Sequence, residues 1–128
     1  SMNLKLMAGF SVFAPLLAAT QATAAGGDPK AGQTVFAQCA ACHKIDTTGK
    51  SGIGPNLNKV IGRTSGTLTG FKYSPAMVAA KRAWTEAALD AYLAAPAKAI
   101  PGNRMPYAGL KSAADRKNVI AYIKSASK

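Results

Sequence analysis

The sequence predicts an all-α fold of three to five short helices joined by long loops. Short segments place apolar residues at the three- and four-residue spacing of a helix, and a polar residue or a proline precedes each of them. No stretch alternates apolar and polar residues as a half-buried strand does, and no βαβ rhythm or internal repeat occurs. With 128 residues, 48% of them hydrophobic, the chain suits one globular domain and is too short for a barrel or a full dinucleotide-binding fold.

The N-terminal segment has the composition of a secretory signal peptide. Ser1 stands before the first methionine and is interpreted as the remnant of an expression tag. Lys5 gives the positive start, residues 6–19 form an uncharged apolar run, and Ala22 and Ala24 provide the small-residue pattern of a signal-peptidase site. The run is short for a helix that crosses a bilayer, so cleavage is favoured over the alternative of a permanent membrane anchor.

This signal divides the chain into two parts. We expect residues 1–24 to be the signal peptide and residues 25–128 to be the working domain, with no stable membrane insertion after cleavage. Export places the domain in an oxidising compartment, which in a bacterium is the periplasm.

The first helix of the domain is expected near residues 29–39. Asp28 can accept hydrogen bonds from the free N–H groups of the first turn, and Pro29 suits the first helical position. Phe36 and Cys39 then follow at helical spacing.

A long loop and a short helix come next. From Thr47 to Thr69 the chain is rich in glycine and has no convincing period, which predicts an extended loop. A loop of this length is unusual in a compact domain and needs something around which to wrap. Ser74 and Pro75 then open a short helix over residues 76–81.

Two more helices are expected in the last third of the chain. Thr85 can cap a helix over residues 86–94, which Pro96 ends. Residues 97–110 form a second loop with two prolines and two glycines. Ser112 begins the last helix, with an acid three residues later as in a capping box.

These helices supply a thin core. Their apolar side chains are mostly alanine, which buries little area, whereas ordering the backbone costs about 1–2 kcal/mol per residue. A large apolar cofactor at the centre would supply the contacts that the side chains lack.

One motif carries the chemistry. Residues 39–43 read Cys-Ala-Ala-Cys-His, the C-x-x-C-H signature of covalent haem attachment. Thiols at i and i+3 lie on one face of a helical turn, so Cys39 and Cys42 can both meet the vinyl groups of one porphyrin. The adjacent His43 can then direct its imidazole to the iron from the same side. The motif therefore predicts one haem c.

Two other interpretations of the motif stay open. A C-x-x-C pair can be a disulfide or a thiol-exchange site, but such a pair usually follows a strand in a βαβ unit, which this sequence lacks. A structural zinc site needs four ligands, whereas Cys39, Cys42 and His43 supply three and the chain has no further Cys or His.

An electron-transfer haem needs a sixth ligand to its iron, and the only histidine is already used. Outside the signal, the thioether candidates are Met77 and Met105. Met77 falls on the expected short helix, where a core-filling role is the simpler interpretation. Met105 lies in a loop stiffened by Pro101 and Pro106, so its sulfur can reach the haem face opposite His43.

Met105 is therefore favoured as the second ligand. A His/Met pair raises the reduction potential and leaves no open position for a substrate, which favours an electron carrier over an enzyme. The alternative is a haem enzyme with a peroxidase-like state, formed when Met105 leaves the iron.

The sequence resembles the small class I cytochromes c, especially the mitochondrial and mitochondrial-like bacterial members. The resemblance covers residues 27–123 and, beyond the haem motif, rests on matching residues in order: Gly32, Phe36, Gly54, Pro55, Asn56, Leu57, Gly62, Arg63, Phe71, Lys72, Tyr73, Ser74, Trp84, Tyr92, Leu93, Pro96, Ile100, Pro101, Gly102, Met105, Gly109 and Tyr122. It implies the cytochrome c fold, wrapped around one covalently bound haem. It also implies a soluble electron carrier between respiratory or photosynthetic redox partners.

The resemblance further implies roles around the haem. Pro55 would orient the imidazole of His43 through its backbone. The haem propionates would receive hydrogen bonds from four side chains: Arg63, Tyr73, Ser74 and Trp84. Tyr92 would lie near the sulfur of Met105. Gly32 would let the first and last helices cross closely. Two aromatic side chains would pack at that crossing: Phe36 and Tyr122.

The charge of +11, from 16 basic and 5 acidic residues, points to an acidic partner. Residues 47–85 contain six basic residues and no acid, and residues 91–114 contain three basic residues (Lys98, Arg104 and Lys111) and again no acid. The second group flanks Met105 and is expected to dock acidic redox proteins, such as membrane oxidase or cytochrome reductase complexes. A generic solvated basic face is the alternative.

Nucleic acid is not expected as a partner, because few aromatic residues interleave with the basic stretches. We also expect the protein to be a monomer.

Overall fold

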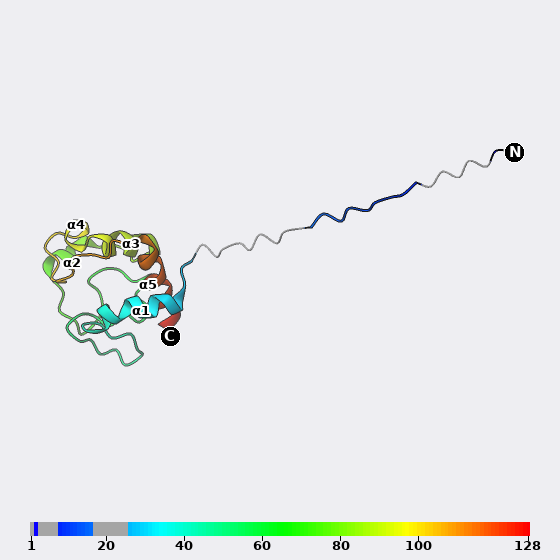
Figure 1. Cartoon of the computed structure of the whole chain (residues 1–128). Coiled ribbons are helices and arrows are strands. Elements are labelled where there is room, and N and C mark those ends of the chain that lie inside the picture. Colours follow the sequence, from blue (N-terminus) through cyan, green and yellow to red (C-terminus); the bar gives the residue numbers. More distant parts are fainter. Residues whose placement is uncertain (1, 3–7, 17–25) are drawn as a thin grey trace.

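The computed structural model describes residues 2, 8–16 and 26–128, and the last of these ranges forms a domain of helices and loops (Figure 1). Its helices are α1 (Pro29–Ala40), α2 (Pro75–Ala80), α3 (Glu86–Ala94), α4 (Pro96–Ala99) and α5 (Ala113–Ala126). In the described ranges the β structure is limited to an isolated antiparallel bridge between Thr64 and Ala83. The predicted all-α class is confirmed.

The helix starts follow the capping residues that the sequence indicates. Side-chain oxygens of four residues each accept a hydrogen bond from a backbone N–H of the first turn: Asp28, Ser74, Thr85 and Ser112. Each such bond satisfies a donor that has no partner inside the helix, which is why these residues fix the helix boundaries.

The prediction of a loop over residues 97–110 is wrong at its start, where Pro96–Ala99 forms α4. Pro96 ends α3 and also occupies the first position of α4, where a missing N–H leaves no bond unmade. Its carbonyl accepts a hydrogen bond from the Ile100 N–H at 3.0 Å. A helix of four residues is too short to show a hydrophobic period.

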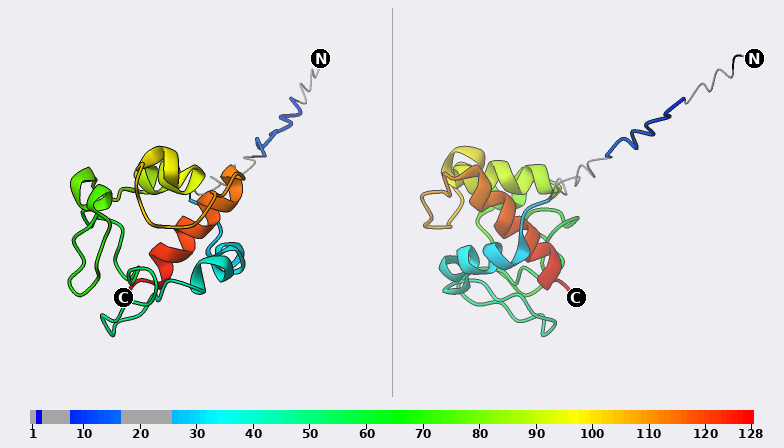
Figure 2. Two further views of the ribbon diagram at one scale, coloured as in Figure 1. Left: turned by 90° about the vertical axis from the view of Figure 1, so that its left-hand side faces the viewer. Right: turned by 45° about the vertical axis from the view of Figure 1, so that its right-hand side comes forward.

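The first and last helices cross in close contact, and both views in Figure 2 show α1 against α5. The crossing is tight at Gly32, because a Cβ there would collide with the Asn118 carbonyl and come 2.9 Å from the Cβ of Tyr122. The rings of Phe36 and Tyr122 pack beside it with centroids 5.0 Å apart. The Asn118 side chain accepts a hydrogen bond from the Asp28 N–H at 2.8 Å. The helix crossing implied by the resemblance is therefore confirmed.

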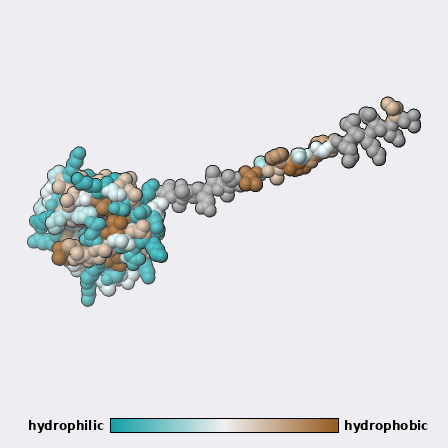
Figure 3. All heavy atoms as spheres, in the orientation of Figure 1, coloured by the Kyte–Doolittle hydropathy of each residue, from teal (hydrophilic) through white to brown (hydrophobic). Residues whose placement is uncertain are grey.

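Most of the predicted signal peptide lies outside the described residues, including Ser1, Lys5 and the cleavage residues Ala22 and Ala24. Residues 8–16, the described part of its apolar run, form no helix, and they appear largely hydrophobic in Figure 3. Across the described ranges, the structure contains no helix with both the length and the apolar character that crossing a bilayer requires.

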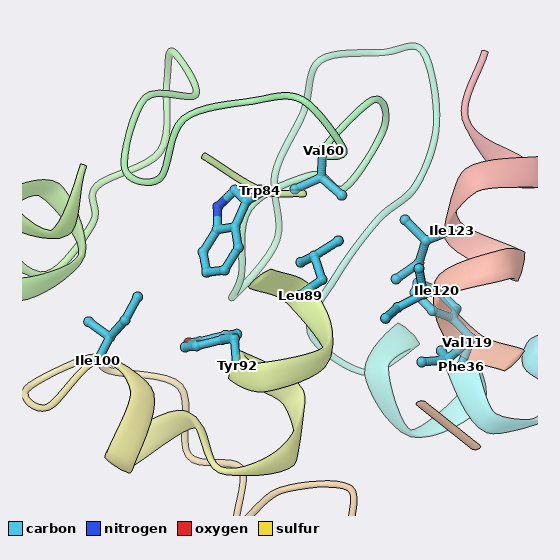
Figure 4. Close-up of a cluster of buried hydrophobic side chains, with 9 residues drawn as sticks. All are labelled: Phe36, Val60, Trp84, Leu89, Tyr92, Ile100, Val119, Ile120 and Ile123. Atoms are coloured by element: carbon cyan, nitrogen blue, oxygen red, sulfur yellow. The ribbon is translucent and has the colours of Figure 1, made fainter. Parts of the chain in front are cut away.

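The buried apolar side chains form two groups in Figure 4. One group lies at the α1–α5 crossing: Phe36, Val119, Ile120 and Ile123. The other surrounds Trp84 and Tyr92, whose ring centroids lie 5.1 Å apart, with Leu89 between the two groups. Long loops cover this core, and the backbone N–H of Gly62 donates to the Trp84 carbonyl at 2.8 Å to hold one of them.

The loop between α1 and α2 is organised by one buried amide. Asn56 is 2% exposed, and its Nδ2 donates to the Asp46 carboxylate and to the Lys50 carbonyl, both at 3.0 Å. Its own N–H donates to the Ser51 hydroxyl at 3.1 Å. These bonds close the loop on itself beside the site described next.

Candidate functional site

A cavity of about 340 Å³ opens into the middle of the core, within the range usual for cofactor pockets. Six of the nine buried core residues also line this cavity: Val60, Trp84, Leu89, Tyr92, Val119 and Ile123. The core side chains therefore surround the cavity instead of filling the centre of the domain, as the thin apolar inventory of the sequence predicts.

The cavity brings together most of the residues singled out from the sequence. Those that line it are Cys39, Cys42, His43, Pro55, Arg63, Tyr73, Ser74, Met77, Trp84, Tyr92, Arg104 and Met105. Lys98 and Lys111 are exposed and do not line it. Both thioether candidates reach the cavity, so its lining alone does not choose between Met77 and Met105.

Backbone hydrogen bonds and the loop at Gly54 and Pro55 fix the position of His43. The His43 and Cys42 N–H groups both donate to the Cys39 carbonyl, at 2.9 and 3.0 Å, which continues α1 by one turn and directs the imidazole into the cavity wall. The ring packs on Gly54, where a Cβ would lie 2.7 Å from Nδ1. Nδ1–H donates to the Pro55 carbonyl at 2.8 Å. This bond fixes the tautomer and leaves Nε2 with a lone pair for a metal.

Burial also favours the neutral, metal-binding form of this imidazole. It lowers the pKa of His43, and the hydrogen bond to Pro55 opposes that shift in part. Burial raises the pKa of the Cys39 thiol, and the neighbouring Cys42 adds to the effect. Cys39 and Cys42 are free thiols that do not bond to each other.

Three of the side chains that the resemblance assigns to the haem propionates make hydrogen bonds to backbone groups of the protein. The Arg63 guanidinium donates to the carbonyls of Asn56, at 3.1 Å, and Asn58, at 2.6 Å. The Tyr73 hydroxyl accepts from the Leu68 N–H at 3.3 Å, and Ser74 caps α2. All three still line the cavity, so these bonds set their positions there.

The segment around Met105 is shaped by an asparagine that the sequence did not single out. The Asn103 Oδ1 accepts from the Met105 N–H at 2.8 Å, and its Nδ2 donates to the carbonyls of Pro96 and Ile100 at 3.0 and 2.9 Å. Asparagine side chains often accept a hydrogen bond from the backbone N–H two residues later in the chain. The sequence therefore indicates a turn near Asn103 but not its bonds to Pro96 and Ile100.

These residues fit a covalently bound haem. Two free thiols, an oriented imidazole and two thioether side chains surround an apolar cavity that lies in the core. In the part of the chain that the structure describes, no three His, Cys, Asp or Glu side chains gather as a metal site, so the zinc interpretation gains no support there.

Several lining residues were not predicted. They are mainly apolar or lie at the mouth: Gln38, Ile53, Leu57, Val60, Phe71, Lys72, Leu89, Leu93, Pro106, Tyr107, Leu110, Val119 and Ile123. Four of them belong to the matches that carry the family resemblance but were given no role at the site: Leu57, Phe71, Lys72 and Leu93. The positions of the others depend on how the loops close over the core.

Tyr92 gives the domain an alkaline pH dependence. Burial raises the pKa of Tyr92 from 10.0 to about 12. Between these two values the unfolded chain has lost a proton that the folded chain keeps, so the unfolding free energy falls as the pH rises through this window. We expect the unfolding free energy of Tyr92→Phe to fall by about 2 kcal/mol less than that of the parent between these two pH values. Urea titrations at several pH values measure this difference, and Tyr122→Phe is the control. An unfolding free energy that falls with pH at the same slope in all three proteins would contradict the prediction.

Comparison with known proteins agrees with this site. Residues 29–127 match the family model described as Cytochrome c. A "Cytochrome c-type cyt cy" of Rhodobacter capsulatus is 53% identical over 98 residues, which are 76% of this chain and 48% of that relative, so the chain spans about half of its length. A "Cytochrome c2" of Rhodoblastus acidophilus is 48% identical over 97 residues, 76% of this chain and 91% of the relative.

The fold has a solved counterpart as well. The structure of cytochrome cH from Methylobacterium extorquens superposes with a TM-score of 0.73 at 36% identity, covering 77% of this chain and 99% of that one. The haem motif, the cavity in the core, the family match over the domain and this structural likeness agree. The chain belongs to the cytochrome c family.

Proposed function

We propose that this cytochrome c is a soluble periplasmic electron carrier whose iron is bound by His43 and Met105. One observation carries the electron-carrier role: an imidazole and a thioether line the cavity that the thiols of Cys39 and Cys42 also reach. Met105 is proposed over Met77 because it lies in the loop between Pro101 and Pro106. When bound, the haem supplies an iron that exchanges one electron between its ferric and ferrous states.

The chain's own residues prepare the site for that exchange. Cys39 and Cys42 would hold the group covalently, and the Pro55 carbonyl keeps the His43 ring in one orientation at 2.8 Å. The apolar walls of the cavity would keep water away from a bound haem and so limit the reorganisation that accompanies a change of charge. His43 and Met105 would together leave the bound iron no free position for a substrate, so the proposed role is electron transfer and not catalysis.

Replacing Met105 with alanine is expected to remove the far-red absorption band that a thioether sulfur gives when it binds ferric haem. Met77→Ala is the matched control, because Met77 lines the same cavity and should keep the band. The same pair of variants tests the enzymatic alternative, since peroxide turnover should rise only in Met105→Ala. Loss of the band in Met77→Ala instead would overturn the choice of ligand.

The proposed partners are acidic faces of membrane oxidase or cytochrome reductase complexes. Arg104 lines the cavity, and Lys98 and Lys111 are exposed on the chain segments before and after it. A basic surface of this kind accelerates encounters with acidic proteins and is screened by salt. The periplasmic location rests on the signal-like residues 1–24 and is proposed with it.

Electron transfer to such a partner should slow by about tenfold or more as salt rises from low to high ionic strength. Replacing Lys98 and Lys111 together by glutamate should slow it further at low salt and flatten the dependence. The matched control replaces Lys30 and Lys117 by glutamate, since both are exposed and neither lines the cavity. Stopped-flow rates measure the effect, and equal losses in the two charge-reversed proteins would contradict docking through this group.

A further inference from the structure

The segment that carries Met105 is attached to the domain very unequally on its two sides. Before Met105, the Asn103 side chain makes three hydrogen bonds, one to the Met105 N–H and two to the carbonyls of Pro96 and Ile100. This side is therefore fixed to α4 and to the turn that follows it.

After Met105, one side-chain hydrogen bond holds the segment until Gly109, whose backbone packs so closely on Ala94 that a Cβ would collide with the Ala94 carbonyl. Within residues 26–128, segment 106–109 makes one hydrogen bond to a distant part of the chain, from the Tyr107 hydroxyl to Gln38 Oε1 at 3.0 Å. The Tyr107 N–H donates only to the Met105 carbonyl, at 2.8 Å, which couples the tyrosine directly to the methionine backbone. The next attachment is the Leu110 N–H, which donates to the Leu93 carbonyl.

The partner of Tyr107 comes from a distant part of the chain. Gln38 lies in the last turn of α1, next to Cys39, and both Gln38 and Tyr107 line the cavity. The bond therefore joins two segments 69 residues apart, one that carries a thiol and one that carries the proposed thioether ligand. Within the described residues, the bond to Gln38 is the one hydrogen bond that the Tyr107 hydroxyl makes.

We propose that Tyr107 and Gln38 are a positioning pair that holds Met105 at the cavity by tying the free side of its segment to α1. This inference rests on the proposed function, in which Met105 binds the iron. Without the bond, the segment pivots on Asn103, and the sulfur leaves its place more often.

The test uses the haem-loaded oxidised protein and cyanide. Cyanide binds the iron only when Met105 has left it, so the association rate reports how often the sulfur departs. We expect Tyr107→Phe and Gln38→Leu each to bind cyanide about two- to tenfold faster than the parent, as loss of one neutral hydrogen bond predicts. The double variant should be no faster than the faster single variant, because both changes remove the same bond. Tyr122→Phe, which removes a hydroxyl at the α1–α5 crossing, should bind cyanide at the parental rate.

A positioning role differs from a general loss of stability. Tyr107→Phe should raise the cyanide rate and lower the guanidinium midpoint by no more than the loss of one hydrogen bond. Ser112→Ala, which removes the cap of α5 and lowers the midpoint by a similar amount, should bind cyanide at the parental rate. Parental cyanide rates in both single variants, or a double variant whose rate is the product of the two single effects, would overturn the pair. A cyanide rate that rises as much in Ser112→Ala as in Tyr107→Phe would also overturn it, because the effect would then follow from general destabilisation. If the thioether band survives in Met105→Ala, the proposed ligand fails, and the pair fails with it; if that band is lost and Tyr107→Phe behaves as the parent, only the pair fails.

Discussion

Replacing Gly32 with alanine is expected to lower the unfolding free energy by about 3 kcal/mol or more. The new Cβ would collide with the Asn118 carbonyl, which belongs to the backbone of α5 and cannot rotate away. It would also come 2.9 Å from the Cβ of Tyr122. The two helices must separate, and the packing of Phe36 on Tyr122 is lost with their contact.

Thermal unfolding followed by far-ultraviolet circular dichroism measures this effect. A loss of this size corresponds to a melting temperature about 12 to 24 °C lower for a domain of about 100 residues. Intrinsic helix propensity acts in the opposite direction, since alanine is favoured over glycine in a helix by about 1 kcal/mol. Gly26→Ala is the matched control, because a Cβ there meets nothing within 4 Å. A Gly32→Ala protein as stable as the parent would mean that α1 and α5 do not approach this closely.

Replacing Gly54 with alanine is expected to displace His43 from its loop. The added Cβ would overlap the imidazole ring, coming 2.7 Å from Nδ1 and 2.8 Å from Nε2. The ring has to turn, and it then loses the hydrogen bond from Nδ1 to the Pro55 carbonyl. Groups that orient a metal-binding histidine typically change metal affinity by about 10- to 100-fold, so we expect a loss of about 1.4 to 2.8 kcal/mol in the stability of the haem-loaded protein.

The measurement for Gly54→Ala is guanidinium unfolding followed by haem absorbance, together with the reduction potential. Gly26→Ala is the control, because a Cβ there meets nothing within 4 Å. We expect a lower unfolding midpoint and a changed potential in Gly54→Ala, and values close to the parent in Gly26→Ala. The same potential in all three proteins would show that the Gly54 position does not orient His43.

Features encoded in a few neighbouring residues were predicted well. The capping positions of Asp28, Ser74, Thr85 and Ser112 follow from the local chemistry of helix starts, and the structure confirms each of them. The haem motif is equally local, because its thiols and imidazole lie within five residues. The family match supports it, since membership of the cytochrome c family implies one haem c.

Features that depend on the closed fold were not predicted. The α4 helix is stabilised by the bond from Ile100 to Pro96 and by Asn103, not by a hydrophobic period. The bonds from Arg63 to Asn56 and Asn58 need a loop conformation that no local pattern specifies. The roles of the propionate-facing side chains and the choice of Met105 over Met77 stay predictions, because both methionines line the cavity.

The crossing of α1 and α5 also orders events in time as the chain is made. Cys39 lies in the last turn of α1, whereas the surface that Gly32 packs against belongs to α5, the last helix in the sequence. At about 5–20 residues per second, α5 is synthesised about 4 to 15 s after α1. During that interval the thiols already exist but the helix that closes the domain does not. The domain can therefore close at the α1–α5 crossing only after its last helix has been made.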